Sequence, residues 1–171
     1  LGLTDRISIY VQECKEMGIP ILPPDVNKST TGFSIEKIGD TEGIRFGLIA
    51  IKNVGEGAIE SIIKHRETTP YSSLWEFCKA VDLKLMNKRV LENLIKSGAC
   101  DSLGDRAQLL AQHESIIDRA QHLARERENG QMGLFGIEEE WIPPTHTHDA
   151  YMSPKEKLSM EKALLGLYLS G

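Results

Sequence analysis

The sequence predicts a mainly α-helical protein that carries one small β-hairpin. Apolar residues recur at helical spacing through most of the 171-residue chain, and turn-forming residues divide this pattern into short runs. The exception is a polar turn at residues 39–43, which lies between two short apolar pairs and is typical of paired strands. With 40% hydrophobic and 26% charged residues, the composition is that of an ordinary globular protein.

The first predicted helix begins near Thr4, which can cap it, and ends at Gly18. Its apolar face consists of Ile7, Tyr10, Val11, Cys14 and Met17. Three prolines, Pro20, Pro23 and Pro24, then favour an extended path because proline fixes φ and has no amide hydrogen. The β-hairpin follows, and its apolar residues are Phe33 and Ile35 before the turn and Ile44 and Phe46 after it.

Three short helices are predicted in the middle of the chain. The first starts at Gly57, ends near residues 68–70 and has an apolar face formed by Ile59, Ile62 and Ile63. The second starts at Ser73, which has capping-box spacing with Glu76. The third is capped by Asn87 and ends at Gly98. Because short isolated helices are marginally stable, we expect tertiary packing to stabilise all three.

The longest predicted helix opens at Asp105 and Gln108 and ends in the charged run at residues 125–128. Residues 129–152 hold several glycines and prolines and no apolar face, which predicts a flexible segment. A last helix starts at Ser153 and ends at Gly166, and the triplet at residues 167–169 is suited to begin a strand of a further domain.

Composition excludes several classes of protein. No apolar run reaches the roughly 20 residues that a membrane-spanning helix needs, and the first residues do not form a signal peptide, so we expect a cytoplasmic protein. The three cysteines are widely spaced and odd in number, which fits neither a disulfide framework nor a zinc site. The absence of an initiator methionine leads us to expect a piece of a longer protein.

The net charge of −5 is unevenly distributed along the chain. Residues 45–98 contain nine Lys or Arg against six Asp or Glu, which makes this part +3. A cationic segment within an acidic chain fits a local contact with phosphate, although a solvated helical surface has the same composition.

The segment at residues 51–57 joins an apolar stretch to a helix start, where backbone N–H groups are free to bind an anion. This is the pattern of a helix-hairpin-helix, whose hairpin amides contact the sugar-phosphate backbone of DNA. The candidate DNA-contacting residues are Lys52, Asn53, Val54, Gly55 and Gly57. Asn53 stands where a glycine is usual, and asparagine tolerates a left-handed backbone better than most residues. A plain tight turn is the alternative interpretation.

A second hairpin of this type is predicted at residues 95–104, with Ser97 and Gly98 as candidate contacts, so that the two hairpins form a tandem. Lys88 and Arg89 lie in the first turn of the helix before it, where cations oppose the helix dipole. This placement suggests an anionic partner; screening of two exposed charges by solvent is the alternative.

No arrangement of residues predicts catalysis. His146, His148 and Asp149 lie in a proline-rich segment that cannot fix the geometry of a metal site, and the same holds for the acidic triplet 138–140. We therefore expect this chain to have no catalytic residue, no bound metal and no cofactor of its own.

The peptide Gln131-Met132-Gly133-Leu134-Phe135 places large apolar side chains between glycines, away from any periodic apolar face. Such a peptide is suited to insert into the pocket of a partner protein. The alternative is that Leu134 and Phe135 fold back onto the protein's own core.

The order of these features resembles the alpha subunit of bacterial DNA polymerase III, a replicative polymerase of the C family. The segments that carry the resemblance are YVQECKEMGI (10–19), LPPDVN (22–27), IRFGL (44–48), GEGAI (55–59), NKRVL (87–91), SGA (97–99), DSLG (101–104) and LGLYLSG (165–171). The resemblance implies four parts: the end of the fingers (1–32), a β-hairpin with a tandem helix-hairpin-helix that binds duplex DNA (33–128), a clamp-binding peptide and linker (129–152), and a helix leading to an oligonucleotide-binding barrel (153–171).

The resemblance also implies partners and activity. Residues 131–135 match the family's peptide for the ring-shaped sliding clamp; Gln131, Leu134 and Phe135 agree with it, whereas Met132 and Gly133 depart from its usual residues. The parent would be a DNA-directed DNA polymerase, a nucleotidyltransferase whose catalytic carboxylates and Mg²⁺ belong to a palm domain upstream of this chain. The expected role is thus noncatalytic: to bind duplex DNA without sequence preference, to tether the polymerase to the clamp, and to join the other domains and subunits. A helix-hairpin-helix module for DNA repair and a purely structural connector are the alternatives.

Overall fold

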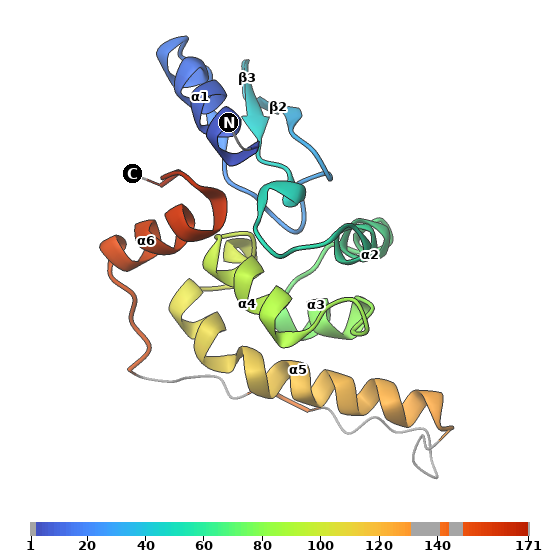
Figure 1. Cartoon of the computed structure of the whole chain (residues 1–171). Helices are drawn as coiled ribbons and strands as arrows, with labels where there is room; N and C mark the ends of the chain where they lie inside the picture. Colours follow the sequence, from blue (N-terminus) through green and yellow to red (C-terminus); the bar gives the residue numbers. More distant parts are fainter. Residues whose placement is uncertain (1–2, 131–140, 144–148, 171) are drawn as a thin grey trace.

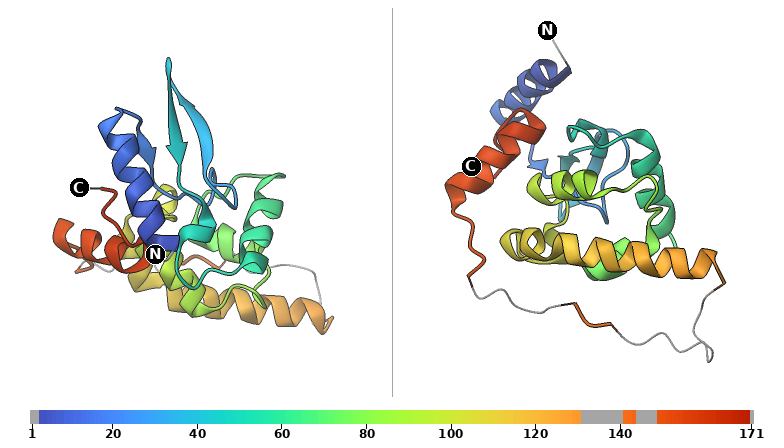
Figure 2. Two further views of the ribbon diagram at one scale, coloured as in Figure 1. Left: turned by 45° about the horizontal axis from the view of Figure 1, so that its top comes forward. Right: turned by 60° about the horizontal axis from the view of Figure 1, so that its bottom comes forward.

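A computed structural model describes residues 3–130, 141–143 and 149–170 and confirms the mainly α-helical fold (Figure 1). The elements in chain order are α1 (Leu3–Glu16), β1 (Ile21–Leu22), β2 (Ser34–Ile38), β3 (Thr41–Arg45), the 3-10 turn η1 (Leu48–Ala50), α2 (Glu56–Arg66), α3 (Leu74–Ala80), α4 (Lys88–Lys96), the 3-10 turn η2 (Asp101–Leu103), α5 (Arg106–Glu128) and α6 (Pro154–Leu165). In the left view of Figure 2, α1 and the β-hairpin lie in the upper part of the molecule and α5 lies along the bottom.

Side-chain caps set the starts of four helices, as the sequence predicts. Ser73 accepts a hydrogen bond from the Glu76 amide at the start of α3, and Asn87 accepts one from the Val90 amide at the start of α4. The equivalent caps of α5 and α6 are Asp105 and Ser153. Each cap satisfies an amide that has no partner inside its helix, so these boundaries are set by residues within one turn of each other.

The N-terminal expectation for α1 is corrected at one point. The helix begins at Leu3, so Thr4 lies inside its first turn and is not the residue that precedes it. The predicted apolar face is only partly buried: Ile7 and Val11 are covered, whereas Tyr10 and Met17 are exposed. The reason is that α1 contacts the sheet along one narrow strip near β1.

The β-sheet has three strands in the order β1-β3-β2, one more than the predicted hairpin. β1 pairs with β3 in parallel through Ile21 and Ile44, a contact between residues far apart in sequence. The turn is also shorter than predicted, because only residues 39–40 form it and Gly43 belongs to β3. A Cβ on Gly43 would lie 2.7 Å from the Ile38 side chain and 3.0 Å from the Pro20 carbonyl oxygen, so this glycine permits close strand packing.

One hydrophobic core joins the parts that the sequence suggested as separate ranges. Its members come from α1, from the tandem hairpin region and from α6, and they include Val11, Phe46, Phe77, Leu94 and Leu165. Tyr71 and Phe77 meet edge to face, with ring centroids 4.8 Å apart. Because the core is shared, α6 is part of the same packed unit as the hairpins.

Residues 167–169, which the sequence suggests as the start of a strand of a further domain, belong to no strand among the described residues. Residues 167–170 follow the left-handed cap Gly166 and are held by the buried carboxylate of Glu161. The amides of Leu169 and Ser170 both donate to Glu161 Oε2, each at 3.1 Å. Backbone donors that would otherwise enter a strand ladder are thus used by a side chain of α6.

The predicted clamp-binding peptide, residues 131–135, lies outside the described residues. Beyond it, Trp141 packs against Trp75 of α3 with ring centroids 4.7 Å apart. Lys79 Nζ lies over the Trp75 ring at 5.2 Å. Trp141 is therefore held against the helical core at α3.

Candidate nucleic-acid interface

The hairpin at residues 51–57 has the conformation that the sequence predicts. Asn53 has a φ of 63° and is the non-glycine residue with positive φ among the described residues. The chain reverses there, and α2 begins directly after Gly55, its N-cap. Asparagine adopts this left-handed conformation more readily than other non-glycine residues, so the substitution of the usual glycine is compatible with the hairpin.

The start of α2 exposes backbone donors. Gly55 has no side chain to cap the helix, and the first helical hydrogen bond runs from the Ile59 amide to the Gly55 carbonyl at 3.1 Å. The backbone amides of Asn53, Gly55 and Gly57 donate no hydrogen bond to another described residue. The amides of Gly55 and Gly57 lie at the N-terminus of α2 and carry the positive end of the helix dipole, whereas Asn53 precedes the helix. Such a helix start can bind an oxyanion.

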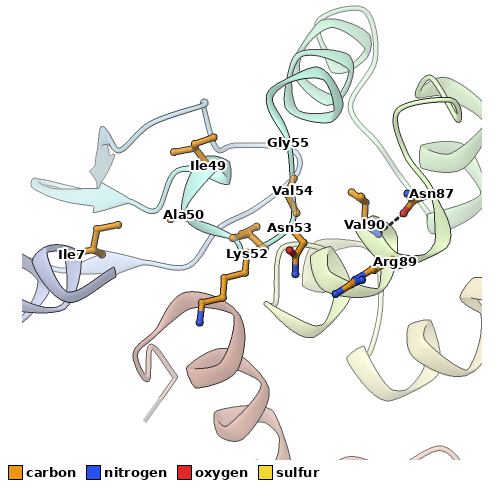
Figure 3. A pocket seen from close by; sticks show the side chains of 11 residues that line it. Ile7, Ile49, Ala50, Lys52, Asn53, Val54, Gly55, Asn87, Arg89 and Val90 are labelled. Carbon is orange, nitrogen blue, oxygen red and sulfur yellow. Dashed lines mark hydrogen bonds between the residues drawn. The ribbon is translucent and has the colours of Figure 1, made fainter. Parts of the chain in front are cut away.

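A surface pocket of about 540 Å³ lies against this hairpin. Its lining combines Lys52, Asn53, Val54 and Gly55 of the hairpin with Asn87, Arg89 and Val90 at the start of α4, and Ile7 and residues 49–51 complete it. Figure 3 shows the Lys52 and Asn53 side chains on the hairpin and the Arg89 side chain directed toward Asn53 from α4. Two segments that the sequence proposed separately therefore meet at one site.

The three predicted cations differ in their surroundings. Lys52 and Arg89 line the pocket. Neither side chain forms an ion pair with another described residue. Lys88 Nζ instead lies 2.9 Å from Asp118 Oδ1 of α5, and the hydrogen bond with Asp118 raises the Lys88 pKa. The placement of Lys88 in the first turn of α4 is thus matched by an acidic side chain of the protein itself.

Ser97 and Gly98 lie at the other end of α4, away from the pocket. Ser97 is only 1% exposed, and its hydroxyl donates to the Leu94 carbonyl. The Gly98 amide donates to the Ile95 carbonyl, and its φ of 92° is a conformation that glycine allows. With these donors used internally, the geometry gives no support to a phosphate contact at Ser97 and Gly98. Val54 is likewise a core residue, 4% exposed, whose amide donates to Ile51.

The hairpin has two supports that sequence reasoning missed. The Lys52 amide donates to the Leu164 carbonyl of α6 at 3.0 Å, and the Lys52 carbonyl accepts from Asn93 Nδ2 of α4 at 3.3 Å. These residues lie 41 and more positions from Lys52 in the sequence, so no local pattern could have indicated the contacts.

The described part of the chain was also compared with the requirements of a metal site and of a membrane-spanning helix. No group of three or more His, Cys, Asp or Glu residues is placed there to hold a metal ion, and His146 and His148 lie outside it. None of the helices in that part has both the length and the apolarity to cross a bilayer.

A hairpin that leads into a helix start, with a second helix packed beside it, is the arrangement of a helix-hairpin-helix. The chain belongs to this family: residues 18–109 match the family model described as a helix-hairpin-helix motif.

The predicted resemblance to DNA polymerase III alpha subunits is confirmed. The chain is 42% identical over 169 residues to DNA polymerase III subunit alpha of Thermus aquaticus, and the alignment covers 98% of the chain and 13% of that protein. Identity to the alpha subunit of Pseudomonas aeruginosa is 40% over 189 residues, covering 98% of the chain and 16% of that protein. Identity to the alpha subunit of Bacillus subtilis is 40% over 171 residues, covering 99% of the chain and 15% of that protein. The chain thus spans a small part of the curated relatives it matches.

Proposed function

We propose that the hairpin at residues 52–57 binds the sugar-phosphate backbone of duplex DNA without sequence preference. The observation that carries this proposal is the uncapped start of α2 at Gly55, which borders a pocket that is also lined by two cations, Lys52 and Arg89. Neither cation forms an ion pair with another residue that the structure describes. Amides and cations of this kind recognise phosphate oxygens and carry no information about base sequence.

The expected affinity is modest. Nonspecific duplex binding has a Kd on the order of 10⁻⁴ to 10⁻⁶ M at physiological salt. The acidic net charge of −5 opposes long-range attraction, which makes the local charge around the pocket decisive. Binding of this strength is suited to a contact that supports a second attachment to the same DNA and does not act alone.

The second attachment that we propose is the sliding clamp. In this proposal the chain is a noncatalytic, cytoplasmic region of a replicative DNA polymerase, and Gln131, Met132, Gly133, Leu134 and Phe135 bind the clamp that encircles the duplex. Burial of Leu134 and Phe135 in a partner pocket would contribute roughly 1.5–3 kcal/mol each, before the cost of ordering the peptide. Two weak contacts on one chain raise each other's effective concentration and so increase processivity. Template-directed synthesis and its Mg²⁺ chemistry would belong to other domains of the parent protein.

DNA binding is tested by titrating a short labelled duplex with the chain and with Lys52→Ala and Arg89→Ala variants. Each substitution should weaken binding and lower the slope of log K against log salt by about 0.9, the value for one lost phosphate contact. Lys155→Ala is the matched control, since this exposed lysine lies at the start of α6 and outside the pocket. Equal losses in all three variants would indicate general electrostatics, and no loss in the pocket variants would refute the proposed contact.

Clamp binding is tested on immobilised clamp. The chain should bind, and a variant with both Leu134→Ala and Phe135→Ala should bind at least tenfold more weakly, because about 1.4 kcal/mol is tenfold in affinity. The same variant should keep its duplex affinity. Equal clamp binding by both proteins would remove the clamp from the proposal and leave a DNA-binding module or a structural connector.

A further inference from the structure

We infer that Asn93 and helix α6 are positioning elements of the DNA-contacting hairpin, so that the binding unit extends beyond the helix-hairpin-helix match at residues 18–109. This inference rests on the proposed function, because it concerns the same site. The two elements do not line the pocket. They act on the backbone of Lys52, the residue immediately before the left-handed turn at Asn53.

Both hydrogen-bonding groups of the Lys52 peptide backbone are held from outside the hairpin. Its amide donates to the Leu164 carbonyl of α6, and its carbonyl accepts from the Asn93 side chain of α4. Asn93 and Leu164 are each 8% exposed, so both partners of the exposed Lys52 lie in buried surroundings, and the bond from Asn93 is partly buried. A shielded hydrogen bond restricts its peptide group, because a replacement partner from solvent is not at hand.

The restriction matters because of the next residue. Asn53 has a φ of 63°, which a residue with a side chain adopts less readily than the common backbone conformations. Such a conformation persists when the surrounding structure determines it. Fixing the Lys52 peptide on one side and starting α2 on the other holds Asn53 between two constrained points. The hairpin backbone at Asn53 and Gly55 is then held in one conformation beside the pocket before any anion arrives, which lowers the ordering cost of binding.

α6 is itself held to the tandem hairpins by a buried ion pair. Glu161 Oε1 lies 3.5 Å from Arg106 Nη1, and the two side chains are 3% and 5% exposed. Arg106 also contacts Asp101 at 2.8 Å. Burial is the largest single influence on Arg106 and lowers its pKa, but Asp101 and Glu161 together outweigh it and raise the pKa overall. The Ser8 hydroxyl donates to the Gly166 carbonyl and ties the end of α6 to α1.

Glu161→Gln separates this positioning role from electrostatics. The substitution removes a negative charge, and general electrostatics therefore predicts tighter DNA binding. It also weakens the attachment of α6, because a glutamine amide cannot accept at every position that the carboxylate serves toward Arg106, Leu169 and Ser170. If α6 positions the hairpin, duplex affinity should fall roughly twofold to tenfold, the range for loss of one hydrogen bond.

Asn93→Leu is the second variant, since leucine has a similar size and cannot donate to the Lys52 carbonyl. Its affinity should fall by a similar factor, while the salt slope stays that of the original chain, because Lys52 and Arg89 are retained. Glu92→Gln is the matched control: it removes one carboxylate from the neighbouring position, and its partner Lys96 lies outside the pocket. This control should bind duplex at least as tightly as the original chain.

Hydrogen exchange provides a readout that needs no DNA. In Glu161→Gln the Lys52 amide should exchange faster, since its acceptor is on α6, while the amides of α3 keep their protection. If the original chain does not bind duplex, or binds it independently of salt, the proposed function is refuted, but the exchange result still stands. Unchanged exchange at Lys52, or unchanged affinity in both variants, would overturn the positioning role.

Discussion

Gly55→Asp should change stability and DNA binding in opposite directions. Gly55 occupies the N-cap of α2 with φ −81° and ψ 164°, a conformation that any N-cap residue adopts. A Cβ there would meet no atom within 4 Å, so the new side chain fits without strain. An aspartate at this position can accept from the free amides of the first turn, as the side chains of Ser73, Asn87, Asp105 and Ser153 do in α3 to α6.

The stability gain is small but measurable. Aspartate exceeds glycine at an N-cap by a few tenths of a kcal/mol, and a negative charge at a helix start adds about 0.3–1 kcal/mol. A gain of about 1 kcal/mol raises the Tm of a protein of this size by about 2–4 °C. Differential scanning calorimetry at low ionic strength measures this shift.

The loss of DNA binding should be larger. The aspartate occupies the amides that the proposal assigns to phosphate and places a negative charge beside that phosphate; a separation of about 5 Å serves for the estimate. At that separation the repulsion is about 0.8 kcal/mol in water and about 3 kcal/mol at an effective dielectric constant of about 20. The expected loss in affinity is thus between about fourfold and about 150-fold, since about 1.4 kcal/mol is tenfold.

Gly55→Asn is the matched control because asparagine caps as well as aspartate and carries no charge. It should give part of the stability gain and lose less affinity than Gly55→Asp. Fluorescence anisotropy of a labelled duplex, measured for the three proteins at one salt concentration, gives the comparison. Duplex affinity in Gly55→Asp equal to that of the original chain would refute the reasoning, because it would show that no phosphate binds at the start of α2.

Three further outcomes follow from the core and the buried polar groups. Phe77→Ala should cost about 3–5 kcal/mol in urea unfolding, because Phe77 is fully buried against Tyr71; a loss below about 1 kcal/mol would contradict this packing. At pH 8, a thiol reagent should modify Cys14 first, since burial raises the pKa of the Cys78 thiol to about 12 and that of Cys100 well above its ordinary value; equal labelling rates of the three thiols, measured by mass spectrometry, would contradict it. The hydrogen bond from Arg45 lowers the pKa of Glu36, so this pair stabilises the folded protein fully above pH 4.5, the ordinary value, and the contribution is lost as pH falls through the lowered pKa. The stability difference between Glu36→Gln and the original chain, measured by denaturation, should therefore be full at pH 6 and shrink as the pH is lowered below 4.5, and a difference that stays constant over this range would count against the pair.

Local signals predicted the helix boundaries well. The caps at Ser73, Asn87, Asp105 and Ser153 depend on a side chain and an amide three residues later, both of which can be read directly from the sequence. The left-handed turn at Asn53 was predicted for the same reason, because it depends on one residue type and the helix start that follows. A cap and its amide are three residues apart, so they meet in any fold that contains that helix, and the sequence alone is enough to predict the contact.

Features that depend on distant residues were missed or assigned wrongly. Gly43 was taken as part of a turn, although it is a strand residue that allows Pro20 and Ile38 to approach. The hydrogen bonds from the Leu169 and Ser170 amides to the Glu161 carboxylate were not predicted. Glycine and apolar residues each have several structural uses, and only the neighbours in space decide between them.

The sequence by itself determined the type of site: a turn at Asn53 followed by the uncapped helix start at Gly55, with cations in the same part of the chain. Hydrogen bonding within one helical turn is enough to specify these features. Only the tertiary structure decided which cations line the pocket, since packing brings Arg89 to it and places Lys88 beside Asp118. Packing also brought Asn93 and Leu164 to the Lys52 backbone, because long-range contacts form only when the shared core brings distant helices together.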